Sequence, residues 1–454
     1  GTFQILDESL AGEIIYDKKN GKILLSIFKS FGERGGLGKS YGTLERITGK
    51  LTSGPSVTLF NNHCVRNSSV NFQLQRLVFS ASCMIFSSSE MRSLEYNKLS
   101  CVLENAYEWS GLKAFKKNEG GITLNEPLEE KLYHWFDATI VFRLKVNTDL
   151  FLPPDDEETK MIQQLVLEIE STQKRQLSWF EDIRDRILAL ISFSIRDNVN
   201  VVEENLYDYE KYVEYPNGFK DYKRQQLINA IPQLQLARTA PWEYNLTLTQ
   251  LPAERDINSD LVKLAPIFNL YLSLFKYPYM PTEMVFLNIV QALETFHARF
   301  FYDNSKDKYV KAVRSRFENT PNEEMFSRLL LSPTQMDENC GYIILVSRLN
   351  DLLINAGTGL FNAFFWGNEG YAQTIADTRH YYTHYGKSKE QKALKGEALI
   401  EQIFVLQTLL EYHVCSVLGI DNSKKIEKEL SCRGAWQDLG KRQSQQMSQT
   451  QGTS

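Results

Sequence analysis

Arg379 and His384 lie five positions apart in a polar segment at the end of a predicted helix over 371–385. An arginine can hold a phosphate group and stabilise the charge that develops on it. A histidine titrates near neutral pH, so it can take or give the proton of a ribose hydroxyl. This combination suits the cleavage of RNA without a metal ion.

The spacing of the two residues limits what one helix can do. At ~100° per residue, Arg379 and His384 lie ~140° apart around the axis, so a partner helix, for example from a second copy, would have to complete a site. The alternative is a polar helix end, with Arg379 on the surface and His384 near the C-terminus, where positive charge is favoured. Gly386 is predicted to terminate this helix.

A second interpretation of the same segment is a zinc-dependent hydrolase. His380 and His384 are four positions apart and share a helix face, as paired zinc ligands do. A third ligand is then required, and His413 and Cys415 qualify only if a neighbouring helix brings them close. Our prediction is a site with no metal and no cofactor.

Glu294 and His297 are candidate supporting residues, on the apolar stripe of a predicted helix over 282–302. Charged groups on such a stripe are costly unless they are paired. They form either an internal ion pair that orders the bundle or a support that orients Arg379 or His384. Asp377 and His380, beside Arg379 in sequence, complete the predicted supporting set.

Three further residues near the end of this helix are predicted to contact RNA. Tyr381 is of a type that more often packs in a core, although it can also stack on an unpaired base. Lys387 and Lys389 belong to a lysine-rich run over 387–395 that is either a solvated surface or a source of phosphate contacts.

The glycine-rich stretch over 35–40 ends in Gly-Lys-Ser and resembles a phosphate-binding loop. Such a loop requires a glycine where this chain has Glu33, and the following sequence predicts more strands rather than a helix. We therefore interpret it as a glycine loop within a β domain.

Residues before about 250 predict a β-rich, mixed N-terminal domain. Short apolar runs separated by Gly, Ser, Asn and Asp are typical of strands, and Asn20-Gly21 predicts a hairpin turn. One segment, 178–196, has helical apolar spacing. The predicted strands are 13–16, 23–28, 56–60, 77–85, 138–146 and 165–169.

From about residue 256 apolar residues recur at three and four positions, which predicts a helical bundle. Pro266 and Pro281 are expected in the first turns of the first two helices, where a missing N–H costs little. The polar stretch 431–454 is predicted to be a disordered tail. The predicted helices are 266–276, 282–302, 309–317, 342–356, 371–385 and 397–418.

Composition narrows the class of protein. The 454 residues include 51 Lys+Arg and 56 Asp+Glu, for a net charge of −5, so any nucleic-acid site must be a local basic patch. The chain has six cysteines without a Cys-x-x-Cys pair, which favours a reducing cytoplasm. We find no signal peptide and no apolar run long enough to span a membrane, and we expect a soluble cytoplasmic protein.

Two groups of residues resemble a known family. The stretch DTRHYYTHY over 377–385, preceded by ALETFH over 292–297, resembles the ApeA-type HEPN ribonuclease domain. The N-terminal residues over 10–17, with 49–50 before 57–59, are similar to the domain that precedes HEPN in ApeA-like bacterial anti-phage proteins. The resemblance implies an α+β protein with a β-rich domain over 1–250 and an all-α HEPN-type bundle over 256–430.

The resemblance also implies an activity. It implies a metal-independent endoribonuclease toxin of antiviral defence, in which two HEPN domains pair as a homodimer and place Arg379 and His384 of each protomer in a composite cleft. Attack by the ribose 2′-hydroxyl would cleave RNA, with tRNA or mRNA as candidate substrates, and cause abortive infection. The N-terminal domain would be a sensor for a phage-derived trigger. The alternative is a non-catalytic HEPN-like module that binds RNA or assembles proteins.

Overall fold

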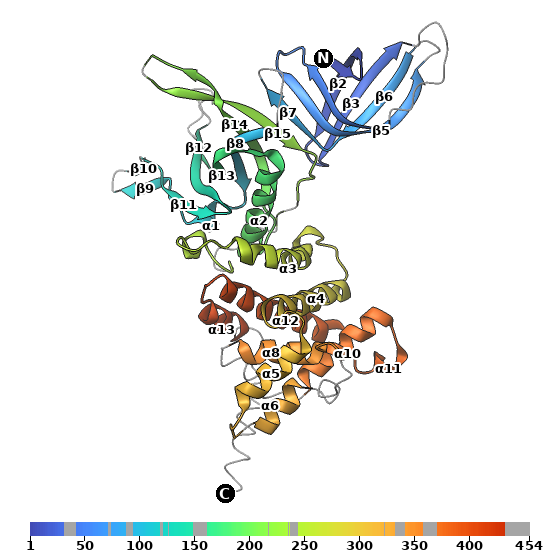
Figure 1. Ribbon diagram of the computed structural model, residues 1–454, viewed down its shortest axis with the longest axis vertical. Coiled ribbons are helices and arrows are strands. Elements are labelled where there is room, and N and C mark those ends of the chain that lie inside the picture. Colours follow the sequence, from blue (N-terminus) through green and yellow to red (C-terminus); the bar gives the residue numbers. More distant parts are fainter. Residues whose placement is uncertain are drawn as a thin grey trace. The chain divides into compact units, whose positions relative to one another are not determined.

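Figure 1 shows the computed structural model, in which strands dominate the N-terminal part and helices the C-terminal part. The described residues are 1–30, 42–70, 74–87, 94–118, 121–125, 127–148, 161–216, 218–234, 236, 244–321, 323–331, 341–356 and 370–431. The glycine loop over 35–40 and the tail beyond Ser431 lie outside them. The predicted α+β class is confirmed.

The chain divides into two compact units. The first contains Gly1–Leu188, Asn198–Arg238 and Ala253–Arg255. The second contains Ala189–Asp197, Thr239–Pro252 and Asp256–Ser454. The predicted domain limits, 1–250 and 256–430, stay a prediction.

Most strands of the first unit belong to one antiparallel sheet. Its order among the described residues is β11-β12-β13-β8-β14-β15-β7-β5-β4-β1-β2-β3-β6, while β9 and β10 form a separate pair. The bounds are β1 Thr2–Ile5, β2 Glu8–Asp17, β3 Lys22–Ser30, β4 Thr43–Lys50, β5 Ser56–Val70, β6 Leu74–Ala81, β7 Cys83–Ser87, β8 Glu95–Glu104, β9 Phe115–Asn118, β10 Gly121–Leu124, β11 Glu130–Trp135, β12 Ala138–Thr148, β13 Met161–Gln176, β14 Asn200–Glu214 and β15 Lys220–Asn229.

Strand β5 closes part of this sheet into a ring. Its first residues pair with β7 and its later residues with β6, which is also the last strand of the order that runs through β4, β1, β2 and β3. The change of partner falls at Asn61, whose φ is +50°. Asparagine adopts this left-handed conformation more readily than most side chains do, so it suits the bend.

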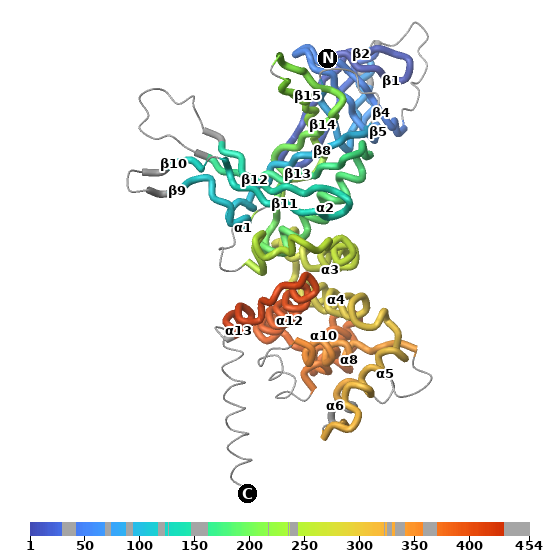
Figure 2. Tube along the Cα trace, turned by 60° about the vertical axis from the view of Figure 1, so that its left-hand side comes forward, coloured from blue at the N-terminus to red at the C-terminus, as the bar shows by residue number. Residues whose placement is uncertain are grey.

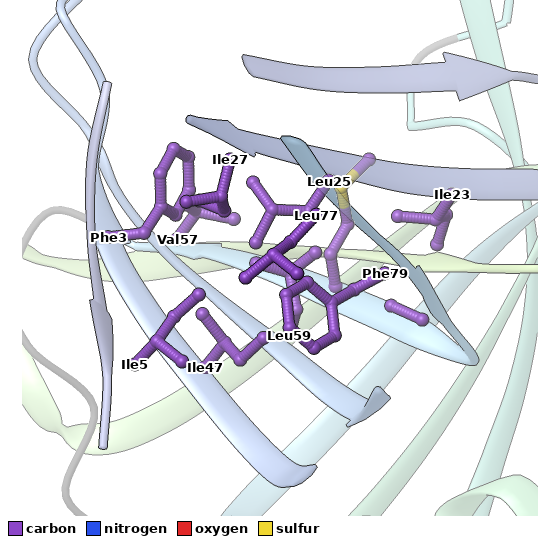
Figure 3. Packing of buried hydrophobic residues seen from close by; sticks show 12 residues of the cluster. Phe3, Ile5, Ile23, Leu25, Ile27, Ile47, Val57, Leu59, Leu77 and Phe79 are labelled. Atoms are coloured by element: carbon purple, nitrogen blue, oxygen red, sulfur yellow. The ribbon is translucent and has the colours of Figure 1, made fainter. Parts of the chain in front are cut away.

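Alternating apolar side chains fill the interior of the ring (Figure 3). The hairpin between β2 and β3 confirms the turn predicted at Asn20-Gly21, because Asp17 pairs with Lys22 and Gly21 has a φ of +58°. A Cβ on Gly21 would lie 2.2 Å from the backbone carbon of Ile231, so only glycine fits there. The predicted strand 77–85 is two strands, β6 and β7, that meet at Ser82.

The predicted helix over 178–196 is confirmed as α2, Leu177–Ile195. Arg184 on this helix is buried and forms an ion pair with the buried Glu204 of β14, with Nη1 2.6 Å from Oε1. Asn229 Nδ2 donates to the other oxygen of Glu204 at 2.8 Å. This polar cluster joins α2 to the sheet of the first unit.

The second unit is a helical bundle, shown as a tube in Figure 2. Its central helix, α4, contacts α3, α8, α10 and α12. Buried Phe286, Ile289, Val290 and Leu293 recur along α4 at three and four positions, so they form one apolar face. The described helices are α3 Asn258–Lys276, α4 Thr282–Phe300, α5 Lys306–Phe317, α6 Glu323–Leu330, α8 Leu345–Asn355, α10 Tyr371–His384, α11 Lys387–Glu390, α12 Gly396–Val417 and α13 Ser423–Ser431.

Helix α3 differs from its prediction. It begins at Asn258, so Pro266 lies inside it rather than in its first turn. A proline there leaves the carbonyl of Val262 without its helical donor, and Val262 is exposed, so water can satisfy that carbonyl.

No helix among the described residues is long and apolar enough to cross a membrane.

Candidate active site

Helix α10 carries the predicted catalytic pair. It begins after Gly370, whose φ is +96°, and ends at His384. The prediction that Gly386 terminates the helix is wrong, because Tyr385 takes the left-handed conformation with a φ of +50° and Gly386 has a φ of −72°. The ring of Tyr385 packs 5.5 Å from that of Tyr381, a contact that helps to hold this strained residue.

Residues on the inner side of α10 fix its position in the bundle. Thr378 is buried, and its Oγ1 accepts a hydrogen bond from the backbone N–H of Leu394 at 3.1 Å. The Tyr382 hydroxyl donates to the carbonyl of the same Leu394 at 2.9 Å, and its ring meets Phe286 of α4 edge-on. These contacts leave the side of α10 that carries His380 and His384 exposed.

Arg379 lies next to α4. Its Nη2 is 3.9 Å from Oε2 of Glu294, and the two side chains are 35% and 28% exposed. The supporting role of Glu294 stays a prediction. A half-exposed ion pair at this distance is weak, so the guanidinium can exchange Glu294 for another anion.

His384 lies beside His380, with ring centroids 4.7 Å apart. Because α10 is helical as far as His384, Arg379 and His384 point ~140° apart around its axis. Arg379 therefore faces Glu294 while His384 shares the face of His380. A single α10 does not aim both catalytic candidates at one point.

Asp377 and Lys389 join α10 to α11. Lys389 Nζ lies 2.6 Å from Oδ1 of Asp377, which also accepts a hydrogen bond from Gln373 at 3.0 Å. Burial raises the pKa of Asp377, but the hydrogen bonds from Lys389 and Gln373 and the charges of Lys389 and Lys392 together hold the pKa below its ordinary value. The predicted RNA contact by Lys389 would have to compete with this ion pair.

His297 lies away from the catalytic pair, in the buried core. Its Nε2 is 3.0 Å from Oδ2 of the buried Asp351, and its ring stacks on Phe301. Burial lowers the pKa of His297 more than the hydrogen bond to Asp351 raises it, so the imidazole is neutral at pH 7. Glu294 and His297 thus have separate partners, and the predicted supporting role of His297 stays a prediction.

Tyr381 and Lys387 are the other two predicted RNA contacts. The ring of Tyr381 is half-buried and lies under the ammonium group of Lys395, 5.3 Å from Nζ to the centroid. Lys387 is exposed at the start of α11. Lys387 is therefore better placed than Lys389 to meet a phosphate.

The zinc interpretation finds no third ligand in the part of the chain that the structure describes. His413 is buried, with Nε2 2.9 Å from the carbonyl oxygen of Leu352. Cys415 is also buried, and its thiol lies 4.0 Å from the carbonyl oxygen of Asn245. Each candidate third ligand is thus engaged elsewhere in the bundle.

Two charged clusters were missed by sequence reasoning. Arg348 and Asp351 of α8 are buried around His297, and Arg196, at the end of α2, pairs with the fully buried Glu411 of α12. These residues lie between apolar positions of their helices. In sequence a charged residue facing a neighbouring helix looks the same as one facing water, so no signal distinguished them.

The structure shows a helical bundle that follows a β-rich N-terminal region. Family models agree with this class: the one described as ApeA N-terminal domain 1 matches residues 1–263, and the one described as Apea-like HEPN matches residues 287–424. The chain belongs to the ApeA family. No curated protein and no solved structure matches it.

Proposed function

We propose that this chain is a metal-independent endoribonuclease of anti-phage defence that causes abortive infection. The observation that supports the proposal is the presence of Arg379 and His384, both accessible to solvent, on one helix of an ApeA-like HEPN bundle. Their divergent directions favour a site built by two copies of the chain, since a second α10 can supply the partner that a single α10 lacks.

The proposed reaction uses the ribose 2′-hydroxyl as the nucleophile. The imidazole of His384 takes its proton as the new bond to phosphorus forms. The bond from phosphorus to the 5′-oxygen breaks, that oxygen takes a proton from water, and the imidazolium returns its proton to the solvent. Arg379 stabilises the negative charge on the phosphorane oxygens. The products are a 2′,3′-cyclic phosphate and a 5′-hydroxyl, and DNA resists because it lacks the 2′-hydroxyl.

The N-terminal unit is the proposed sensor of a phage-derived trigger. It holds the toxin inactive in the cytoplasm of an uninfected cell, and the RNA substrate is a tRNA or an mRNA. This assignment rests on the match of the first unit to the ApeA N-terminal domain.

A second candidate is a non-catalytic HEPN module that binds RNA or assembles proteins. The observation in its favour is that Arg379 and Lys389 each have a carboxylate partner inside the chain, Glu294 and Asp377. This candidate predicts stoichiometric binding of RNA without turnover.

Chelator-resistant cleavage distinguishes the two candidates. Because the proposed sensor keeps the toxin inactive without its trigger, purified full-length protein is incubated with total bacterial RNA in EDTA together with a protein extract of phage-infected cells, and the fragment ends are identified. The ribonuclease proposal expects cyclic-phosphate ends with the wild type and with the control His134→Ala, an exposed histidine of the first unit, and none with His384→Ala or Arg379→Ala. Cleavage retained by His384→Ala would refute it.

A further inference from the structure

A cavity of about 560 Å³ lies on the helical unit beside Glu294. Its walls come from α3, α4, the turn after α4 and α8, and include Lys263, Arg299, Asn304 and Arg348. We propose that this cavity binds phosphate groups of an RNA strand, with Arg348 as its anchor. The identity of the strand rests on the proposed function, whereas the anionic chemistry of the ligand rests on the residues below.

Arg348 is a buried cation that has only neutral acceptors. It is 4% exposed, and its guanidinium donates to the carbonyl oxygen of Ile343 at 3.1 Å, to Nδ1 of His297 at 3.4 Å and to Oδ1 of Asn304. Among the described residues no carboxylate oxygen forms an ion pair with it at 4.0 Å or less. Among the described residues Glu294, which lines the same cavity, attracts this charge but only from beyond 4.0 Å. A buried cation without a direct ion pair is costly, so an anion in the cavity would be stabilised there.

The neighbouring carboxylate, Asp351, is already engaged. Its two oxygens meet His297 Nε2 at 3.0 Å and Arg316 Nη1 at 3.2 Å. A neutral His297 donates from Nε2 to Asp351 and accepts at Nδ1 from Arg348, which agrees with its lowered pKa. This network holds Arg348 in place at the cavity without neutralising it.

The rim of the cavity is exposed and carries long basic side chains. Arg299 and Lys263 are both exposed, and Arg299 Nη1 donates to the carbonyl of Lys263 at 3.3 Å. With Arg348 they give three cations against two lining carboxylates, Glu294 and Asp303, a net charge of +1. Arginine is well suited to phosphate because its planar fork can donate two parallel hydrogen bonds.

Glu294 connects the cavity to the candidate catalytic arginine. It lines the cavity, and its Oε2 is 3.9 Å from Nη2 of Arg379. A strand whose reacting phosphate lies on Arg379 would therefore pass the residue that also lines the cavity. This continuity favours a polymer over a free nucleotide as the occupant.

The test is equilibrium binding of a short single-stranded RNA, followed by fluorescence anisotropy on the full-length protein. His384→Ala serves as the background in every sample, so that cleavage does not change the ligand. The cavity variant is Lys263→Gln/Arg299→Gln. The matched control is Lys311→Gln/Arg314→Gln, which removes the same charge from exposed positions of α5 outside the cavity.

We expect the cavity variant to bind RNA about 10-fold more weakly and to lower the slope of log K against log salt by ~1.4, or ~0.7 for each phosphate that the protein no longer neutralises. The control should stay within about 2-fold of the background, because distant charges act through a screened field. Equally weakened binding in both variants would overturn the proposal, since it would show a general charge effect.

A variant of the anchor adds a second measurement. Arg348→Met should weaken RNA binding further, and a thermal melt shows whether the bundle of this variant remains folded. If it does not, the cavity variant alone decides the outcome. Adenosine monophosphate is added as a competitor. If it displaces the RNA when the two ligands are present at equal concentrations of phosphate groups, the cavity prefers no strand over a single nucleotide, and the proposal is overturned.

This outcome is separable from that of the proposed function. Cleavage by the wild type, together with wild-type binding by the cavity variant, refutes the cavity and leaves the ribonuclease intact. Binding that depends on the cavity, with no cleavage by the wild type under any condition, supports the cavity and refutes the ribonuclease.

Discussion

The carboxylate of Glu294 on α4 lies 3.9 Å from the guanidinium of Arg379 on α10. Both side chains are partly exposed, so the pair contributes only ~0.2–1 kcal/mol to stability. A phosphate that approaches Arg379 therefore competes with a carboxylate that is easily displaced. We therefore expect Glu294 to weaken the binding of RNA, and its replacement by a neutral residue to change the affinity for RNA in a predictable direction.

Glu294→Gln should strengthen binding of RNA. A unit charge ~4 Å from the phosphate site opposes binding by ~1 kcal/mol in water, so its removal tightens binding ~5-fold. The measurement is RNA affinity in the His384→Ala background, and Glu401→Gln, at an exposed position of α12, is the control. Weaker binding by Glu294→Gln would instead mean that Glu294 is needed to orient Arg379.

We expect Lys387 to contribute to RNA binding and Lys389 to contribute to the stability of the bundle. Lys389→Gln leaves the nearly buried Asp377 without its ion-pair partner and should lower the melting temperature of the bundle. Lys387→Gln removes an exposed charge and should weaken RNA binding without changing that temperature. Calorimetry and anisotropy on both variants check the pattern, and a reversed pattern contradicts it.

His413 should make the helical unit sensitive to acid. Burial lowers its pKa to about 4, below the ordinary 6.5, so the folded state favours the neutral imidazole. Its contribution to stability is present above pH 6.5 and is lost as pH falls toward 4. Over that interval the loss approaches ~3 kcal/mol, at ~1.4 kcal/mol per pKa unit.

The measurement is the free energy of unfolding of the helical unit between neutral and acidic pH. His413→Gln keeps a donor for the carbonyl of Leu352 and should flatten the profile in this range. His380→Gln, at an exposed position, should leave the profile unchanged. An unaltered slope in His413→Gln would show that other groups cause the acid sensitivity.

Arg196 and Glu411 should be essential to the stability of the same unit. The guanidinium of Arg196 pairs with the fully buried Glu411 and lies 2.8 Å from Glu429, and the Tyr271 hydroxyl donates to Glu411 at 2.5 Å. Arg196→Met leaves the Glu411 charge without its main partner, at a cost of ~3–5 kcal/mol. Urea unfolding followed by circular dichroism measures that loss.

An exposed ion pair provides the comparison for Arg196. Lys395 and Glu390 of the same unit pair with both side chains exposed, so Lys395→Met should cost at most ~1 kcal/mol. Burial raises the pKa of Glu411, but the charge and hydrogen bond of Arg196, the charge of Lys425 and the hydrogen bond from Tyr271 together hold the pKa below its ordinary value. The stability that this pair provides is therefore present at neutral pH and lost as pH falls through the acidic range.

Local sequence patterns predicted the α+β class and the longer helices, but the predicted strands correspond to only seven of the fifteen strands among the described residues: β2, β3, β5, β6, β7, β12 and β13. Helical apolar spacing placed α10 and α12 within a residue of their observed ends, and Asn20-Gly21 placed the β2–β3 turn. The prediction for α3 began too late because Pro266 was expected in a first turn. Helix α11 lacks a periodic apolar face, so its pattern gave no signal.

The sequence by itself determined which residues could do chemistry, since Arg379 and His384 and their spacing can be read directly from the chain. It also determined that one helix points them apart, because the angle depends only on the residue count. These properties are local, and a chain specifies local geometry within a few residues.

Only the tertiary structure decided how charges pair over long distances. In the folded chain Glu294 lies next to Arg379, His297 forms a hydrogen bond with Asp351, and Arg348 is buried beside a cavity. Each of these contacts joins helices that are distant in sequence, and which face of a helix meets which neighbour depends on the packing of all of them together. For that reason the site residues could be named from the sequence, while their partners could not.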